Sequence, residues 1–109
     1  MSPLEVITER HGDQTRLALV GELDIASTPQ FEEGLAEVEG DTPGTLVVDL
    51  RRVEFIDSTG LRAVIAADER ARAAGRRFVV VRGPAAVERV FSVTQLDQRL
   101  DLVDDPDSV

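Results

Sequence analysis

Residues 55–61 read Phe-Ile-Asp-Ser-Thr-Gly-Leu, and this stretch lies where an apolar, strand-like run changes to a helical pattern. Asp57, Ser58 and Thr59 carry side-chain oxygens that can accept a hydrogen bond from the N–H groups of a first helical turn. One interpretation is therefore a helix cap, which stabilises a helix by about 1 kcal/mol. A second role is compatible with it, because a serine at a helix N-terminus is accessible to a modifying enzyme.

The residues after this stretch predict a helix over positions 58–74. Small and aliphatic side chains recur at helical spacing, at Leu61, Val64, Ile65, Ala67, Ala71 and Ala74. A stripe of this kind lets a helix pack closely against a sheet. Gly75 is expected to end the helix, since glycine adopts the left-handed conformation that helix C-termini often need.

Four other segments predict strands. Residues 45–50 and 78–81 are almost continuously apolar, which is typical of parallel strands buried on both faces. Residues 4–8 and 15–23 are joined by a short turn at His11-Gly12-Asp13 and predict an antiparallel hairpin. Residues 100–103 form either a last short strand or a helix end, and the acidic residues 104–109 are expected to fray.

Two more helices are expected. Thr28 and Pro29 suit a helix N-cap and first position, and the segment from Gly40 to Gly44 ends that helix. Residues 85–91 predict a short helix after Gly83. Helices that alternate with strands after a hairpin predict an α/β fold with parallel strands beside an antiparallel edge.

Length and composition limit the functions that are open to the chain. At 109 residues it is predicted to be one domain, and without cysteine it has no disulfide, thiolate metal site or cysteine nucleophile. The net charge of −9 argues against nucleic-acid binding, and no apolar run is long enough to span a membrane or act as a signal peptide. We therefore expect a cytoplasmic protein. The nine arginines of residues 50–95 indicate either solvated faces or a basic patch for an acidic partner.

The sequence gives little evidence of an enzymatic site. Neither of the common glycine-rich nucleotide loops is present, and no lysine is available to contact a phosphate. Asp24, Asp49 and Asp57 could cluster at the carboxyl ends of strands, where α/β sheets hold their sites, but loop capping explains them more simply. His11 lies in a turn with no serine nucleophile motif to serve. We expect no catalytic residue, no bound cofactor and no metal.

Four segments together resemble the STAS domain of bacterial anti-sigma factor antagonists. They are Gly-Glu-Leu-Asp at 21–24, Val-Val-Asp-Leu at 47–50, the stretch at 55–61 with its following helix, and residues 90–97. The resemblance extends from about residue 4 to 103. It implies a single domain with a mixed sheet of four to five strands, about four helices and an acidic tail over 104–109.

The resemblance also implies function by partner switching. The unphosphorylated antagonist binds an anti-sigma factor that is also a serine kinase, and a sigma factor is released. The kinase, with its own ATP and Mg²⁺, then phosphorylates the motif serine, here Ser58 (alternatively Thr59), and a serine phosphatase resets it. Partner contacts are expected from Asp24, Asp57, Ser58, Thr59, Gly60, Leu61 and Arg62, and the chain is expected to be a monomer.

Two positions depart from the family pattern. Arg62 and Gln95 stand where the family often has glycine, and Arg62 is placed to contact either the partner or a phosphate. Two other functions stay open: a STAS-like interaction subunit of a larger signalling or transport complex that works without phosphorylation, and a small enzyme built on Asp24, Asp49 and Asp57. The intact Ser58 favours the phosphorylated switch over both.

Overall fold

A computed structural model describes residues 4–109, which contain one five-stranded sheet and three α-helices. The elements in chain order are β1 (Glu5–His11), β2 (Gln14–Leu23), α1 (Thr28–Gly40), β3 (Thr45–Ile56), α2 (Ser58–Ala73), β4 (Arg77–Val81), α3 (Ala85–Val93), the single-turn 3₁₀ helix η1 (Leu96–Gln98), β5 (Asp101–Val103) and a second such turn, η2 (Pro106–Ser108).

The sheet has the order β1-β2-β3-β4-β5. β1 and β2 form an antiparallel hairpin through the two-residue turn between His11 and Gln14, and the pairs from β2 to β5 are all parallel. The α/β class, the hairpin and the mixed five-stranded sheet are as the sequence predicts. β3 continues six residues past the apolar run to Ile56, so its end reaches the 55–61 stretch directly.

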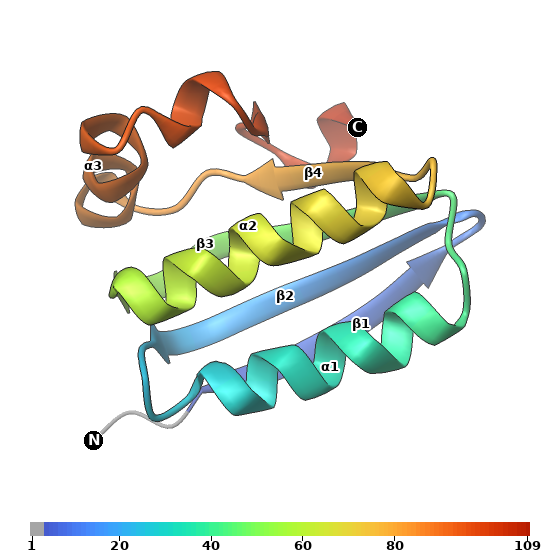
Figure 1. Ribbon diagram of the computed structural model, residues 1–109, viewed down its shortest axis with the longest axis horizontal. Helices are drawn as coiled ribbons and strands as arrows, with labels where there is room; N and C mark the ends of the chain where they lie inside the picture. Colours follow the sequence, from blue (N-terminus) through green and yellow to red (C-terminus); the bar gives the residue numbers. More distant parts are fainter. Residues whose placement is uncertain (1–3) are drawn as a thin grey trace.

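The main core lies between the sheet and its helices. α1 and α2 cover one face of the sheet side by side, and α3 lies beyond the carboxyl end of β4 (Figure 1). The predicted stripe on α2 is buried in its central part, at Val64, Ala67 and Ala71, whereas Ala74 is exposed. Against it pack the leucines and valines of the strands together with Phe31, Leu35 and Phe91 of the other helices.

The opposite face of the sheet carries a small second core. Val47, Val79 and Val81 are fully buried there, and Val103 and Val109 pack against them. The acidic tail, expected to fray, therefore folds back over the sheet: Pro106 in η2 is buried, Asp107 pairs with Arg16 at 3.2 Å and Asp104 with Arg82 at 3.2 Å. Burial of valine side chains that would otherwise face water stabilises this arrangement.

The expectation of about four helices is wrong: residues 4–109 form three α-helices. Where a fourth would follow, α3 ends at Val93 and Gln95 adopts a left-handed φ of 62°, so only the single turn η1 forms. This conformation costs a non-glycine residue roughly 1 kcal/mol, which accounts for the glycine that the family often has at position 95.

The arginines of the second half of the chain serve mostly within the fold. Five of them form ion pairs with acids of this chain, as Arg51–Asp49, Arg70–Glu39, Arg72–Asp68, Arg77–Asp101 and Arg82–Glu88. This pairing favours solvated, internally compensated faces over a basic patch that waits for an acidic partner.

Candidate functional site

The carboxyl ends of β2 and β3 lie next to each other and form a corner with the starts of α1 and α2. Leu23 and Ile56 are the last paired residues of the two strands. Asp57 follows at once and joins the two chain segments through its carboxylate: Oδ1 accepts the N–H of Gly60 at 2.9 Å, and Oδ2 accepts the N–H of Ile25 at 2.9 Å. Asp57 is therefore the N-cap of α2 and also holds the β2–α1 loop in place.

Gly60 brings the first turn of α2 directly onto the end of β2. A Cβ at this position would lie 2.6 Å from the backbone oxygen of Leu23, which is too short for any side chain. Leu61, the next residue, is buried in the main core. Both residues are predicted partner contacts, and in the fold they are buried beneath the surface of the corner, where they support its shape.

Ser58 is exposed at the start of α2, and its hydroxyl has no hydrogen-bond partner among residues 4–109. Because Asp57 supplies the cap, this hydroxyl is not needed to satisfy the helix N-terminus. Thr59 is half-buried. It lines a groove of about 320 Å³ between α1 and α2, which is also lined by Thr28, Glu32, Arg62, Ala63 and Ala66. Arg62 is exposed, one helical turn after Ser58, and forms no ion pair within the described chain.

The start of α1 differs from the expectation that Thr28 is its N-cap. Ser27 is the N-cap and Thr28 is the first helical residue, and both side chains are buried. The Ser27 hydroxyl donates to the carbonyl of Glu22 at 2.7 Å, and the Thr28 hydroxyl donates to the carbonyl of Asp24 at 2.7 Å. Asp24 in turn accepts the N–H groups of Ala26 and Ser27 at 3.0 Å. The Asp24 carboxylate thus builds the loop beside the corner.

Two large apolar side chains near the corner were not expected to be exposed. Ile25 is 72% and Phe55 is 49% exposed. Strand alternation would bury Phe55 on the same face as Val53, but the pairing of β2 with β3 shifts register between Gly21 and Glu22, and Ile56 is buried in its place. Bulges of this kind re-aim side chains, and the sequence carries no clear signal for this one except Gly21, whose φ is +116°.

The three aspartates do not form one acidic site. Asp24 and Asp57 lie at the corner. Asp49 lies elsewhere: its Oδ2 accepts a hydrogen bond from Nη2 of Arg51 at 2.8 Å, and it lines a pocket with the tail residue Asp107. The hydrogen bond to Asp49 raises the pKa of the Arg51 guanidinium above its ordinary value. Between residues 4 and 109, no cluster of three or more His, Asp or Glu side chains is placed to hold a metal ion.

His11 is remote from this corner. It is the exposed last residue of β1, next to the β1–β2 turn, and its Nε2 lies 3.1 Å from a carboxylate oxygen of Glu9. The turn joins the amino end of β2, while Ser58 follows the carboxyl end of the neighbouring parallel strand. The sheet therefore separates the imidazole from the serine hydroxyl. In the described part of the chain, no helix is long and apolar enough to cross a membrane.

Known proteins resemble this chain over most of its length. A family model described as "Mlab, STAS domain" matches residues 6–104. The anti-sigma-F factor antagonist RsfB of Mycobacterium tuberculosis is 33% identical over 95 residues, which cover 87% of this chain and 77% of that protein. An anti-sigma-B factor antagonist of Staphylococcus epidermidis is 26% identical over 93 residues, covering 85% of this chain and 86% of the relative.

Solved structures give the same result. The crystal structure of an anti-sigma factor antagonist from Mycobacterium paratuberculosis has a TM-score of 0.90 and 30% identity, covering 96% of this chain and 89% of the other. The unphosphorylated form of the antagonist SpoIIAA shares the fold at a TM-score of 0.79 and 19% identity, covering 95% and 92% of the two chains. With both kinds of match extending over nearly its full length, the chain belongs to the STAS domain family.

Proposed function

We propose that this chain is an anti-sigma factor antagonist that acts by partner switching through the Ser58 corner. In its unphosphorylated form it binds an anti-sigma factor serine kinase, and a sigma factor is released from that kinase. Phosphorylation of Ser58 ends the binding, and a serine phosphatase restores it. The kinase supplies ATP and Mg²⁺, and the chain itself carries out no chemistry.

One observation supports this proposal most directly. The Ser58 hydroxyl is exposed and makes no hydrogen bond within residues 4–109, because Asp57 caps the helix in its place. A kinase can therefore use this hydroxyl without breaking a hydrogen bond of the fold. The first turn of α2 also tolerates the product, since free N–H groups and the helix dipole stabilise a phosphate there.

The surroundings of Ser58 explain how a phosphate would release a partner. Ile25 and Phe55 expose apolar surface close to the corner, which suits a protein contact. A phosphate adds about −1.5 to −2 charges at pH 7. A partner packed on the corner would have to desolvate that charge, and an uncompensated buried charge weakens an interface strongly.

The direct test is phosphorylation by the cognate anti-sigma factor kinase with ATP and Mg²⁺, followed by mass spectrometry of the peptides. Wild-type protein should gain one phosphate on Ser58, and Ser58→Ala should gain none while still binding the kinase. Ser27→Ala is a matched control and should be phosphorylated like the wild type, because the Ser27 hydroxyl is buried. Phosphate on Thr59 alone would keep the mechanism but move the modified residue.

Binding measurements separate this function from the runner-up, a STAS interaction subunit that works without phosphorylation. On the switch mechanism, Ser58→Asp binds the kinase at least about tenfold more weakly than wild type, a loss of roughly 1.4 kcal/mol. No phosphate on the wild type, together with equal binding of Ser58→Asp and wild type to their partner, would contradict the switch and favour the subunit.

A further inference from the structure

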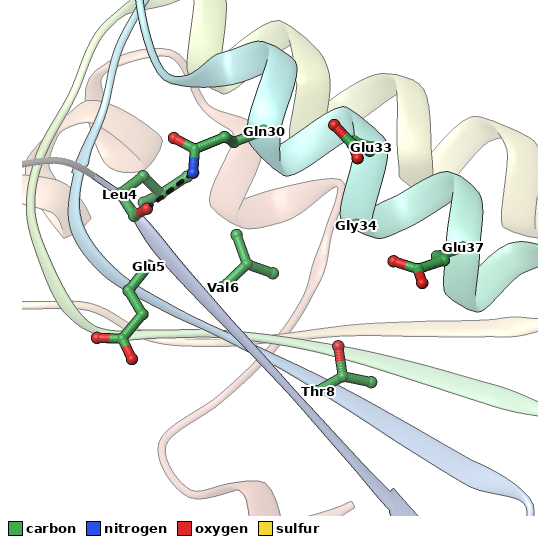
Figure 2. Close-up of a pocket in the computed structure, with 8 residues that line it drawn as sticks. All are labelled: Leu4, Glu5, Val6, Thr8, Gln30, Glu33, Gly34 and Glu37. Atoms are coloured by element: carbon green, nitrogen blue, oxygen red, sulfur yellow. Dashed lines mark hydrogen bonds between the residues drawn. The ribbon is translucent and has the colours of Figure 1, made fainter.

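A second surface lies between the edge strand β1 and helix α1. It is a groove of about 480 Å³. We call it the β1–α1 groove, and Figure 2 shows Val6 and Thr8 of β1 facing the helix that carries its other walls. Its lining from α1 consists of Gln30, Glu33, Gly34 and Glu37.

The floor of the groove is a close approach of helix and strand. A Cβ at Gly34 would lie 3.1 Å from Cγ1 of Val6, so α1 lies low over the middle of β1. Val6 is only partly buried there and packs against the main core. The groove thus offers a small apolar floor beside a strand, with the helix as its wall.

No strand among residues 4–109 pairs with the outer edge of β1 along this groove. β1 pairs only with β2 in the described sheet, and the pair His11–Gln14 closes a two-residue turn. In an antiparallel pair of strands, hydrogen-bonded and non-hydrogen-bonded residue pairs alternate. Counted from His11–Gln14, Val6 and Thr8 belong to the non-hydrogen-bonded pairs, so their backbone N–H and C=O groups point away from β2. At the start of the strand, Gln30 donates to the Leu4 carbonyl at 3.2 Å, so one outward group is already satisfied by α1.

The groove is strongly acidic. Glu33 and Glu37 are exposed, neither forms an ion pair within residues 4–109, and no basic side chain lines the groove. Arg10 lines an adjoining pocket with Thr8 and Glu37, and its guanidinium pairs with Asp41. This differs from the second half of the chain, where the arginines are mostly matched by acids of the fold.

From this combination we propose that the β1–α1 groove binds an extended, basic segment of another protein, which adds to β1 as a sixth strand. Side chains on one face of a strand repeat about every 6.6 Å. Glu33 and Glu37 are one helical turn apart, about 6 Å along α1. A segment with Arg or Lys at alternate positions therefore sets one cation against each glutamate while its backbone pairs with Val6 and Thr8.

A second copy of this chain is a poorer occupant. Pairing two β1 strands would bring two acidic grooves together, and like charges that face each other are destabilising. The proposed segment has the opposite charge and needs only the few residues that β1 can pair. The surface is separate from the Ser58 corner, so the inference does not depend on the proposed function.

The test uses a fluorescent peptide as long as β1, seven residues, in which arginine alternates with threonine. Its binding is followed by fluorescence anisotropy, and the site is mapped from amide NMR shifts of the protein. We expect the largest shifts at Val6 and Thr8, and an affinity that falls with added salt. A peptide of the same composition with its arginines grouped at one end should bind more weakly.

Variants separate groove binding from general attraction to an acidic protein. Glu33→Gln with Glu37→Gln should weaken binding at least about fivefold. The control pair Glu54→Gln with Glu69→Gln removes the same charge from exposed, unpaired glutamates elsewhere and should change binding by less than about twofold. Ser58→Asp should also leave it unchanged, which keeps this result distinct from a failure of the phosphorylation switch.

The strand-addition step has its own variant. Thr8→Pro removes an outward N–H from an edge strand, where proline is tolerated, and should abolish peptide binding while the circular dichroism spectrum stays unchanged. If that variant unfolds, the glutamate pair still decides the matter. Equal loss in the groove and control pairs, shifts that map outside β1 and α1, or dimerisation through β1 that the peptide does not compete with would each overturn the proposal.

Discussion

The starts of α1 and α2 are built from the same kinds of residue but use them differently. Each follows the end of a parallel strand at the same edge of the sheet, and each has an aspartate and two adjacent hydroxyl residues. At α1 the hydroxyls of Ser27 and Thr28 are buried and donate to backbone carbonyls. At α2 the carboxylate of Asp57 makes the cap, and Ser58 stays exposed.

The difference shows that a hydroxyl at a helix start is available for chemistry only when another side chain does the structural work. Around α1, the serine and threonine close the loop, so removing them breaks hydrogen bonds. At the start of α2, Asp57 caps the helix and Gly60 lets it approach the end of β2 closely. The fold does not require the Ser58 hydroxyl. Stability measurements on matched variants test this difference between the two helix starts.

The largest effect is expected from glycine replacement. Gly60→Ala places a Cβ 2.6 Å from the backbone oxygen of Leu23, and a backbone atom cannot move aside cheaply. We expect the free energy of unfolding to fall by about 3 kcal/mol, despite a gain of about 1 kcal/mol in helix propensity. Urea unfolding measures it, with circular dichroism as the signal.

Gly34→Ala in α1 is the matched control for that measurement. The tightest contact of its Cβ would be with Cγ1 of Val6 at 3.1 Å, a side-chain atom that can shift, and the Cδ atoms of Leu17 would lie at an ordinary 3.8 and 3.9 Å. The helix-propensity gain should offset the contact, leaving the stability within about 1 kcal/mol of wild type. Equal losses of stability for Gly60→Ala and Gly34→Ala would show that the close approach of α2 to β2 does not make Gly60 more important than Gly34 for stability.

The next effect compares the two serines. Ser27→Ala removes a buried hydroxyl that donates to Glu22 at 2.7 Å and accepts the N–H of Asp24 at 3.0 Å, so we expect a loss of about 2 kcal/mol. Ser58→Ala should cost less than about 0.5 kcal/mol, as for most exposed positions. Urea midpoints at unchanged m-values measure both. A large loss of stability for Ser58→Ala would mean that its hydroxyl makes an interaction that stabilises the fold.

A smaller loss than that of Ser27→Ala is expected at the cap itself. Asp57→Ala removes the acceptor for the N–H groups of Gly60 and Ile25, but Ile25 lies at the surface, where water replaces the lost partner. We expect a loss of about 1 kcal/mol. Asp57→Asn keeps one acceptor oxygen and should lose about half as much. Hydrogen exchange at Ile25 should accelerate in Asp57→Ala, and an unchanged rate there would argue against the bridge between the loops.

Much of the architecture was predictable because it depends on local pattern. Continuous valine and leucine runs predicted the buried strands, and the stripe before Gly75 predicted α2 with its end, where Gly75 adopts a φ of +71°. The helix count and the tail were harder. The count depends on the left-handed turn at Gln95, and the position of the tail depends on Val47 and Val79, which lie far away in sequence.

The site was predictable as a sequence stretch but not as a surface. The order of residues 55–61 places an acid before two hydroxyls and a glycine, which already predicts a capped helix start. It does not say which group caps. The exposure of Phe55 follows from the register shift between β2 and β3, and the burial of Leu61 follows from its place in the main core. Nor does the sequence bring Ile25 to Asp57, since that hydrogen bond joins residues 32 positions apart.

The amino-acid order alone is enough to predict the α/β order, the helix that begins at Ser58 and the residue types at the corner, because these depend on near neighbours in the chain. The packing of the folded chain sets which hydroxyls are buried and which is exposed, and among residues 4–109 it leaves the acidic edge of β1 beside α1 unpaired. The reason is that exposure and pairing belong to contacts between distant segments. A Ser-Thr pair stands at the start of each helix: at α1 both hydroxyls hold the preceding loop by hydrogen bonds, and at α2 the serine hydroxyl is accessible.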